Sequence, residues 1–202
     1  MALSSTAGST RGVPFVAFGR PWGEAPARHP WVDVDGRAGV RLAVDHLADR
    51  GHQRIAWVGW QKTSTIGEDR RNGWLDRMHE RQLPTTRLSA RGEDTIEFGR
   101  RAAHALFEGE QPTAFMCVSD TVAMGVLQAI SDLGRRAGPG DVAVVGFDDS
   151  LAAQVTGLTS VRQPLEEVAV QIVRLLEDRL SMRTSDEPHV ILTPELRVRV
   201  TS

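Results

Sequence analysis

Polar and aromatic side chains follow several apolar runs of this sequence, close to the points where those runs end. A carboxylate, an amide, a guanidinium, a hydroxyl and an indole are represented, in the residues Trp60, Arg70, Ser119, Asp148 and Gln163. Carboxylate and guanidinium groups make directional, charge-assisted hydrogen bonds to hydroxyls. An indole or phenyl ring offers a flat apolar face for the C–H side of a sugar ring. The combination favours binding of a neutral, polyhydroxylated ligand.

Several of these residues also have a purely structural interpretation. Asp120 fits the N-cap of the helix that it precedes, and Asp148 with Asp149 fits a turn and cap pair. Arg70 on a charged helix face is usually solvated, and Trp74 at helical spacing is more often a core residue than a ligand platform. The site therefore depends on whether the fold brings these side chains to one place.

Cofactor and catalytic motifs are missing from the sequence. There is no glycine-rich phosphate loop, no Gly-x-Gly-x-x-Gly after a strand and no Gly-x-Ser-x-Gly, which counts against nucleotide chemistry and against a hydrolase. His46 and His52 flank the end of one helix without an evident third ligand, so a surface or capping role is favoured over metal binding. Asp120 and Asp148 have the side chains for general acid and base catalysis. Their spacing gives no sign that they meet, so we expect no cofactor, no metal and no enzyme activity.

The composition is that of a soluble globular protein, with 202 residues, 41% of them hydrophobic and 25% charged. A net charge of −2 and a pI of about 6.3 argue against a broad cationic surface for nucleic acid or acidic lipid. Cys117 is the single cysteine and lies in an apolar run, so it is expected to be a buried small hydrophobe rather than part of a disulfide framework. The composition of residues 1–12 predicts a flexible leader, and these residues lack the pattern of a secretory signal. No apolar run approaches the roughly 20 residues that span a bilayer, and the expected location is the cytoplasm.

Strands and helices alternate along the chain. The expected strands are 14–18, 55–58, 86–90, 114–118, 142–147, 158–161, 189–192 and 196–200. The expected helices run from Asp35-Gly36 to Gly51 and over 68–82, 95–108, 120–134 and 165–181. This order predicts an α/β protein with mostly parallel sheets covered on both faces, in which ligands bind outside the carboxyl ends of the strands.

The spacing of several motifs resembles the ligand domain of the LacI/GalR (lac/gal-repressor) family of bacterial transcription regulators. The block Asp141-Val-Ala-Val-Val-Gly-Phe-Asp-Asp149 is the most specific of them. The others are Asp35-Gly36-x-x-Gly39, His46-Leu47-x-x-x-Gly51-His52-Gln53-Arg54-Ile55-Ala56, Arg70-x-x-Gly73-Trp74, Ser119-Asp120-x-x-Ala123-x-Gly125, Leu158-Thr159-Ser160-Val161-Arg162-Gln163-Pro164 and Leu192-x-Pro194-x-Leu196-x-x-Arg199-x-x-Ser202. The resemblance covers residues 13–202 in unbroken order.

The resemblance implies a periplasmic-binding-protein-like (type I) fold, with two lobes of parallel sheet flanked by helices and a small-molecule effector between them. It implies that Arg70 binds a sugar hydroxyl and that Asp148 binds the effector. Further contacts with the effector are implied for Ser119, Gln163, Leu165 and Phe18. Asp120 begins the helix that the family uses in dimer contact, and Met124 lies on its interface face, which implies a homodimer. Gly19 and Asp94 depart from the family pattern and leave the effector open.

The resemblance also sets expected domain boundaries. Residues 13–31 and 163–187 correspond to part of the first lobe, and residues 32–162 with 188–202 to the second. The family's helix-turn-helix, its hinge helix and most of its first lobe have no counterpart in this sequence, so the expected first lobe is incomplete. Operator DNA would be bound only through that helix-turn-helix. With its apolar faces exposed, the isolated chain is expected to be less stable than a longer relative and to bind effector weakly.

The leading hypothesis is thus the effector-sensing and dimerising part of a transcription regulator, in which effector shifts a conformational equilibrium that sets DNA affinity. A free solute-binding protein of the same fold is the main alternative, and a sugar-acting enzyme a further one.

Overall fold

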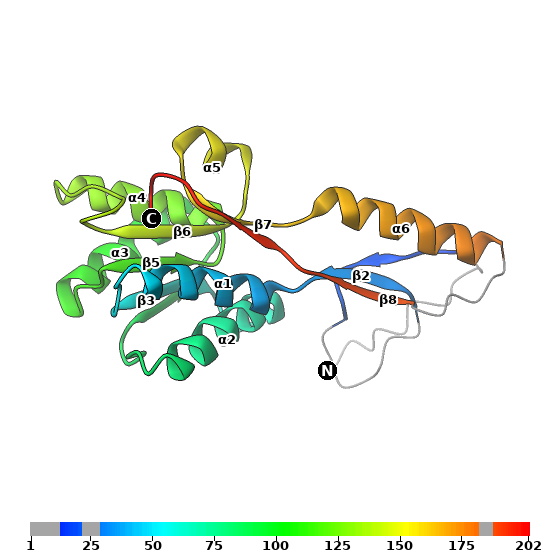
Figure 1. The fold of residues 1–202 in the computed structure, drawn as a ribbon, viewed down its shortest axis with the longest axis horizontal. Helices are drawn as coiled ribbons and strands as arrows, with labels where there is room; N and C mark the ends of the chain where they lie inside the picture. Colours follow the sequence, from blue (N-terminus) through cyan, green and yellow to red (C-terminus); the bar gives the residue numbers. More distant parts are fainter. Residues whose placement is uncertain (1–12, 22–28, 182–187) are drawn as a thin grey trace, which may run out of the picture. The chain divides into compact units, whose positions relative to one another are not determined.

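The computed structural model describes residues 13–21, 29–181 and 188–202, which form two compact units. Unit 1 takes its described residues from the stretches up to Val34 and Leu165–Leu192. Unit 2 consists of Asp35–Pro164 and Thr193–Ser202. The chain therefore passes from one unit to the other three times, and each unit is assembled from two separated stretches of chain (Figure 1). The expected leader, residues 1–12, lies outside the described residues.

The unit boundaries differ from the expected lobe boundaries at three places. Residues 163–164 belong to unit 2 rather than to the smaller unit. At the other two places, residues 32–34 and 188–192 belong to unit 1 rather than to the larger unit. The reason is a strand that the sequence analysis missed, β2 (Trp31–Val34), which pairs in parallel with both β1 (Ala17–Phe18) and β8 (His189–Leu192). These three strands form a sheet of their own, in the order β1-β2-β8.

Unit 1 is completed by one amphipathic helix, α6 (Leu165–Leu180). Its buried residues Val168 and Leu175 pack with Val32 and Val34 of β2, and Ile172 packs beside them. Figure 1 shows α6 lying along this small sheet. Within the expected strand 14–18, regular pairing is confined to Ala17 and Phe18.

Unit 2 is built on a six-stranded sheet in the order β4-β3-β5-β6-β7-β9. The strands are β3 (Ile55–Trp60), β4 (Ser89–Gly92), β5 (Ala114–Cys117), β6 (Ala143–Asp148), β7 (Thr159–Arg162) and β9 (Glu195–Arg197). All neighbours pair in parallel except β7 and β9, which are antiparallel. The α/β expectation is confirmed, because β3, β5 and β6 are the apolar runs that the sequence marks as strands buried on both faces.

Five helices accompany the sheet of unit 2: α1 (Gly36–Asp49), α2 (Thr65–Glu80), α3 (Ile96–Gly109), α4 (Asp120–Asp132) and α5 (Leu151–Thr156). Each begins after a short polar side chain that accepts a backbone N–H, as N-caps do. One cap differs from expectation. Ser119 caps α4 through its hydroxyl, and Asp120 is the first residue of the helix. The short helix α5 was not predicted, because six residues are too few for a helical period to show.

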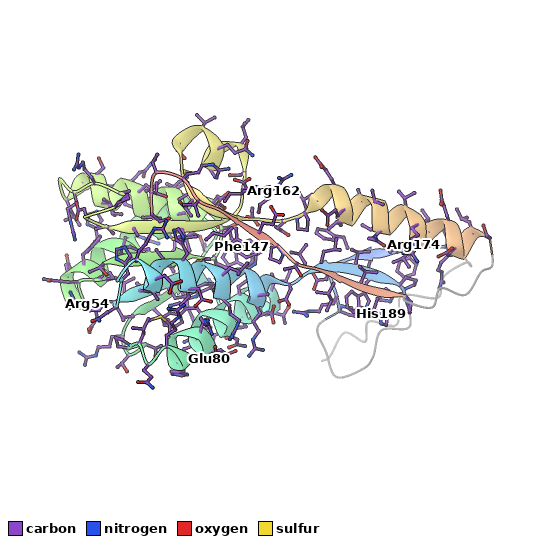
Figure 2. All side chains as sticks on the ribbon, in the orientation of Figure 1. Arg54, Glu80, Phe147, Arg162, Arg174 and His189 are labelled. Atoms are coloured by element: carbon purple, nitrogen blue, oxygen red, sulfur yellow. The ribbon has the colours of Figure 1, made fainter. Side chains whose placement is uncertain are left out.

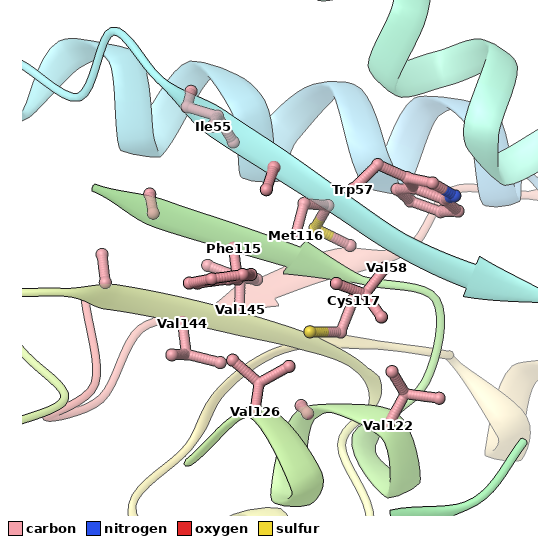
Figure 3. Close-up of a cluster of buried hydrophobic side chains, with 14 of the residues drawn as sticks. Ile55, Trp57, Val58, Phe115, Met116, Cys117, Val122, Val126, Val144 and Val145 are labelled. Carbon is pink, nitrogen blue, oxygen red and sulfur yellow. The ribbon is translucent and has the colours of Figure 1, made fainter. Parts of the chain in front are cut away.

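The core of unit 2 lies on both faces of its sheet. Figure 3 shows α1 on one side and α4, with Val122 and Val126, on the other. Trp57 of β3 and Trp74 of α2 are both buried, with ring centroids 6.4 Å apart, so Trp74 is a core residue as the helical spacing indicates. Cys117 is fully buried, and burial raises the pKa of its thiol.

None of the helices that the structure describes is long and apolar enough to cross a membrane.

Candidate functional site

Five of the expected site residues lie at the carboxyl end of the sheet of unit 2: Trp60, Arg70, Ser119, Asp148 and Gln163. Figure 2 labels Arg54 just before β3, at the amino end, and Phe147 near the carboxyl end of β6. Trp60 is the last residue of β3 and Asp148 the last residue of β6. Ser119 is the second residue after the end of β5. Parallel strands all end at the same edge of a sheet, and this edge is the usual ligand site of open α/β sheets.

Arg70 projects from α2 into this site and is only 6% exposed, contrary to the solvated position that a charged helix face suggests. Its guanidinium carbon lies 3.6 Å from the centroid of the Phe147 ring and 5.4 Å from that of Trp60. Its Nη1 donates a hydrogen bond of 2.7 Å to the carbonyl oxygen of Val118. Stacking and hydrogen bonding together hold a positive charge in a fixed orientation at the strand ends.

Asp148 faces this arginine. Its Oδ1 lies 3.7 Å from Nη2 of Arg70 and accepts a hydrogen bond of 2.7 Å from Nε2 of Gln163, which follows β7. The pKa of Asp148 is raised to about 6, chiefly by burial and also by the charges of Asp120 and Asp94, against the opposing pull of Arg70 and Gln163. Arg70, Asp148 and Gln163 are therefore brought together, as the proposed binding surface requires.

The backbone around Asp148 is strained. Asp148 has φ 112° and Asp149 has φ 55°, the left-handed region that L-residues other than glycine seldom occupy. Strain of this kind persists where the surroundings over-determine it, and it concentrates at ligand-binding positions. Here it re-aims the Asp148 carboxylate at the end of β6.

A network behind the site holds this strained turn. The Asp149 carboxylate accepts a hydrogen bond of 2.6 Å from Arg199, and its backbone N–H donates to Ser160 Oγ at 3.0 Å. The Ser160 hydroxyl donates to Oδ1 of Asp120 at 2.6 Å, and the backbone N–H of Ser150 donates to Oδ2 of Asp120 at 2.7 Å. Three hydrogen bonds to side chains therefore hold Asp149 and Ser150, the two residues that follow Asp148.

Asp120 is thus an internal residue, 3% exposed, and burial raises the pKa of its carboxyl. A Cβ placed on Gly146 would lie 2.3 Å from its Oδ1, so the carboxylate fits only because β6 has a glycine there. Both carboxylate oxygens bond within unit 2, and the part of Asp120 in a dimer contact stays a prediction. Met124, one turn further along α4, is half-buried and accepts a weak contact from the Thr156 hydroxyl at 3.9 Å.

One participant was missed by sequence reasoning. The hydroxyl of Ser119 donates to Oδ1 of Asp94, which lies in the connection after β4 and is exposed. The sequence analysis noted Asp94 only as a departure from a family pattern. Its signal was weak, because the strand before it was expected at 86–90, whereas β4 runs from Ser89 to Gly92. Asp94 therefore lies two residues after the strand and not four, as the expected boundary implied.

Trp60 contributes an unsatisfied polar group. Its indole Nε1 is buried and has no hydrogen-bond acceptor among the residues that the structure describes. Buried N–H groups without a partner are rare in proteins and call for an explanation such as a ligand.

Two expected contacts fall in the other unit. Phe18 and Leu165 are both exposed and both belong to unit 1, so their part in the site stays a prediction.

The histidines considered as metal ligands lie at the amino end of the unit 2 sheet. His46 bonds Ser202 at 2.8 Å and His52 bonds Thr113 at 3.2 Å, and His52 lines a cavity of about 360 Å³ there. Among the described residues, no group of three or more His, Cys, Asp or Glu side chains is arranged to hold a metal ion.

Comparison with known proteins agrees with this fold. Residues 44–202 match the family model of the periplasmic binding protein-like domain. The regulator CelR of Thermobifida fusca is 33% identical over 93% of this chain and 56% of its own length. The regulator reg1 of Streptomyces lividans is 34% identical over 94% of this chain and 56% of its own.

Solved structures give the same result. A LacI-family regulatory protein from Chloroflexus aggregans has a TM-score of 0.87 and 39% identity, over 94% of this chain and 68% of that one. The CelR–cellobiose complex has a TM-score of 0.85 and 32% identity, over 95% of this chain and 59% of that one. Each of these relatives is named as a regulatory protein, and none as an enzyme.

The sheet order, the helix arrangement and the strand-end site define a periplasmic-binding-protein-like effector domain. The chain belongs to the LacI/GalR family of transcription regulators. It spans just over half the length of the sequence relatives named above.

Proposed function

We propose that this domain senses a small hydroxyl-rich effector, a sugar or a related polar metabolite, for a LacI/GalR-type transcription regulator. The observation that carries the proposal is the array in which the Arg70 guanidinium lies 3.7 Å from the Asp148 carboxylate and Gln163 donates to the same carboxylate at 2.7 Å. A carboxylate accepts from sugar hydroxyls, while guanidinium and amide groups donate to them. The buried indole N–H of Trp60 offers one more donor.

Effector binding would act on DNA through a helix-turn-helix module that the described residues do not contain. An effector that binds two conformations of the regulator unequally shifts their populations and thereby changes DNA affinity. The CelR–cellobiose structure supports a saccharide as the kind of effector, because its sequence and fold are similar over 95% of this chain. A regulator of this kind acts in the cytoplasm, where its operator DNA lies.

The experiment is a ligand screen with matched variants. Thermal stability of the chain is measured with cellobiose, maltose, glucose and arabinose, for the wild type, Arg70→Gln and Arg54→Gln. Arg54 is the control, because it is an exposed arginine at the amino end of the sheet. We expect at least one sugar to raise the Tm of the wild type and of Arg54→Gln but not of Arg70→Gln. Absence of any response, or an unchanged response in Arg70→Gln, contradicts the proposal.

We also propose a homodimer formed through the α4–α5 region. Leu151 and Val155 are 75% and 79% exposed and lie one turn apart on α5, and Thr156 of α5 contacts Met124 of α4. Two exposed aliphatic side chains on one short helix beside a methionine form an apolar surface that a second copy can cover. Met124 then belongs to the contact, as expected. The buried Asp120 contributes through its hydrogen bonds to Ser160 and Ser150 within unit 2.

A further inference from the structure

The polar groups of the site form one continuous array with a carboxylate at each end. Asp94 accepts from Ser119, and the neighbouring carbonyl of Val118 accepts from Arg70, which faces Asp148. The array thus holds two carboxylates and one guanidinium. The sequence predicted a site with a single carboxylate, Asp148, opposite the arginine, because Asp94 was not recognised as part of it.

The single guanidinium is largely committed to the protein. Its Nη1 is bonded to a backbone carbonyl, and its plane lies 3.6 Å from the Phe147 ring, which orients it and leaves little of it exposed. An arginine that holds an anion normally presents two N–H groups side by side to it. Arg70 is therefore not placed to act as such a clamp for an anionic ligand, although it keeps its full positive charge.

The charged groups that act on Asp148 are one guanidinium and two carboxylates. Burial is the largest cause of the raised pKa of Asp148, Arg70 opposes it, and Asp120 and Asp94 add to it. Burial disfavours an ion of either sign, so the preference for a cation comes from the excess of carboxylates over the single guanidinium and not from the retained proton.

The other arginines near the strand ends do not reverse this excess. Arg91 is paired with Glu68, with two hydrogen bonds between them. Arg162 lies beside Asp148 in the β6–β7 register, and the charges that act most on the pKa of Asp148 are those of Arg70, Asp120 and Asp94. Asp94 accepts a single hydrogen bond through Oδ1, and its exposed carboxylate can accept from a ligand.

We propose that the site selects its effector by charge, that Asp94 is the residue that sets this selection, and that the preferred ligand is a saccharide bearing an amino group. The inference rests on the effector role proposed above and names the ligand class for the same surface. An ammonium group placed against Asp94 replaces a repulsion between carboxylates by an ion pair, and a phosphate or carboxylate placed there adds a third negative charge.

The test compares ligands of one shape and different charge. Glucosamine, glucose, N-acetylglucosamine and glucose 6-phosphate are titrated into the chain at pH 7 and low salt, and binding is followed by the NMR signal of the Trp60 indole N–H, assigned with Trp60→Phe. We expect glucosamine to bind about twofold to fivefold more tightly than glucose or N-acetylglucosamine, as an exposed ion pair allows. Glucose 6-phosphate is expected to bind at least tenfold more weakly than glucose. Raising the salt to 1 M should reduce both differences, because exposed charges are then screened.

Asp94→Asn supplies the decisive comparison, with Glu93→Gln as control, since Glu93 is the neighbouring exposed acid and makes no contact in the array. Asp94→Asn should bind glucosamine and glucose equally, while Glu93→Gln keeps the wild-type order. Equal binding of glucosamine and glucose by the wild type, tighter binding of glucose 6-phosphate, or an unchanged order in Asp94→Asn each overturns the selection by charge. If sugars bind but without that order, the effector role survives. If none of the four ligands binds, the selection by charge is also overturned, and the sugar screen described above then decides whether the effector role stands.

Discussion

Asp148 is the residue at which binding and stability oppose each other. A carboxyl whose pKa is raised in the folded protein is destabilising when ionised, because folding removes it from water and places it near other negative charges. Such residues are typically retained for binding, at the expense of stability.

Asp148→Asn is therefore expected to raise stability and weaken binding. The amide keeps an acceptor for Gln163 and carries no charge to desolvate. Since solvent screens part of the repulsion at this half-buried side chain, the gain is about 1 kcal/mol, or a Tm about 2–4 °C higher at pH 7. Affinity for the effector should fall about 10-fold to 100-fold, because a charged acceptor is lost. Calorimetric scans and titrations of the variant provide the measurement. A lower Tm at pH 7 would contradict this interpretation.

The same residue predicts the pH dependence of stability. The folded protein retains the Asp148 proton up to about pH 6, whereas an ordinary aspartate loses it near pH 3.8. The wild type therefore loses stability relative to Asp148→Asn as the pH rises from about 4 to about 6, and the difference is constant above that range. Urea unfolding of both proteins at pH 4, 5, 6 and 7 measures it. The two stability profiles should converge near pH 4, and a difference that persists there would contradict the assignment.

Effector affinity should change in the opposite direction with pH. A hydroxyl donates to the ionised carboxylate, so affinity is expected to be constant above pH 7 and to fall about tenfold per unit below pH 6. The dependence should be absent in Asp148→Asn. Titrations with a ligand that moves the Trp60 indole signal measure both. A flat profile for the wild type would mean that Asp148 does not contact the ligand.

Much of the site could be predicted from sequence and part of it could not, for a physical reason. Arg70, Ser119, Asp148 and Gln163 come just after strands or from a long motif, so their meeting point follows from the topology of a parallel sheet. The ring of Phe147 beneath Arg70 and the burial of Asp120 depend on side-chain packing, and no periodicity encodes packing. Asp94 was missed as a site residue because the strand before it is short and polar, and its end was expected at residue 90 rather than at Gly92.

At the scale of elements, the closest contact is between α3 and α4. A Cβ on Gly125 would lie 2.0 Å from the carbonyl oxygen of Ile96 and 2.6 Å from the backbone nitrogen of Arg100. Gly99 is the matching residue on α3, where a Cβ would lie 2.2 Å from the carbonyl oxygen of Val122. The two helices touch through their backbones, and α4 in turn carries Ser119 and Asp120 at its start.

Gly125→Ala is expected to destabilise the protein by about 1–3 kcal/mol or more, because backbone atoms must move apart to admit a methyl group. Gly109→Ala is the matched control. Gly109 is the last residue of α3, the helix that Gly125 of α4 contacts, and a Cβ on Gly109 would meet nothing within 4 Å. Alanine there should be neutral or stabilising by up to about 1 kcal/mol. Chemical denaturation of both variants measures the difference. Equal stabilities would show that α3 and α4 are not held this closely.

The elements themselves were largely predictable. The helices α1, α3, α4 and α6 follow from apolar residues at helical spacing, with boundaries within two residues of the expected ones. The strand β2 was missed because Trp-Val-Asp-Val directly follows a proline-rich loop and carries a charge at its third position. That omission also misplaced the domain boundaries, because β2 is the central strand of the unit 1 sheet.

At the scale of the whole molecule, the proposed dimer makes a specific prediction. Leu151→Asp combined with Val155→Asp should convert a dimer to a monomer without loss of fold, since both side chains are exposed in one copy. Two buried charges facing their copies across a twofold axis would be prohibitively unfavourable. Analytical ultracentrifugation with circular dichroism provides the measurement.

Val170→Asp with Val173→Asp is the control, since these residues are also exposed valines but belong to α6 of unit 1. This variant should remain dimeric. If it becomes the monomer and the α5 variant does not, the contact lies on unit 1 instead.

The way unit 1 is assembled also constrains the order of events on the ribosome. Its central strand pairs Trp31 with His189, residues that emerge more than 150 positions apart. All of Asp35–Pro164 is made in the interval, and that stretch contains every strand of the larger sheet except β9. The strand β2 must therefore wait without β8, the strand that pairs with it, while unit 2 folds. Chaperone protection of an unpaired strand is most needed in this situation.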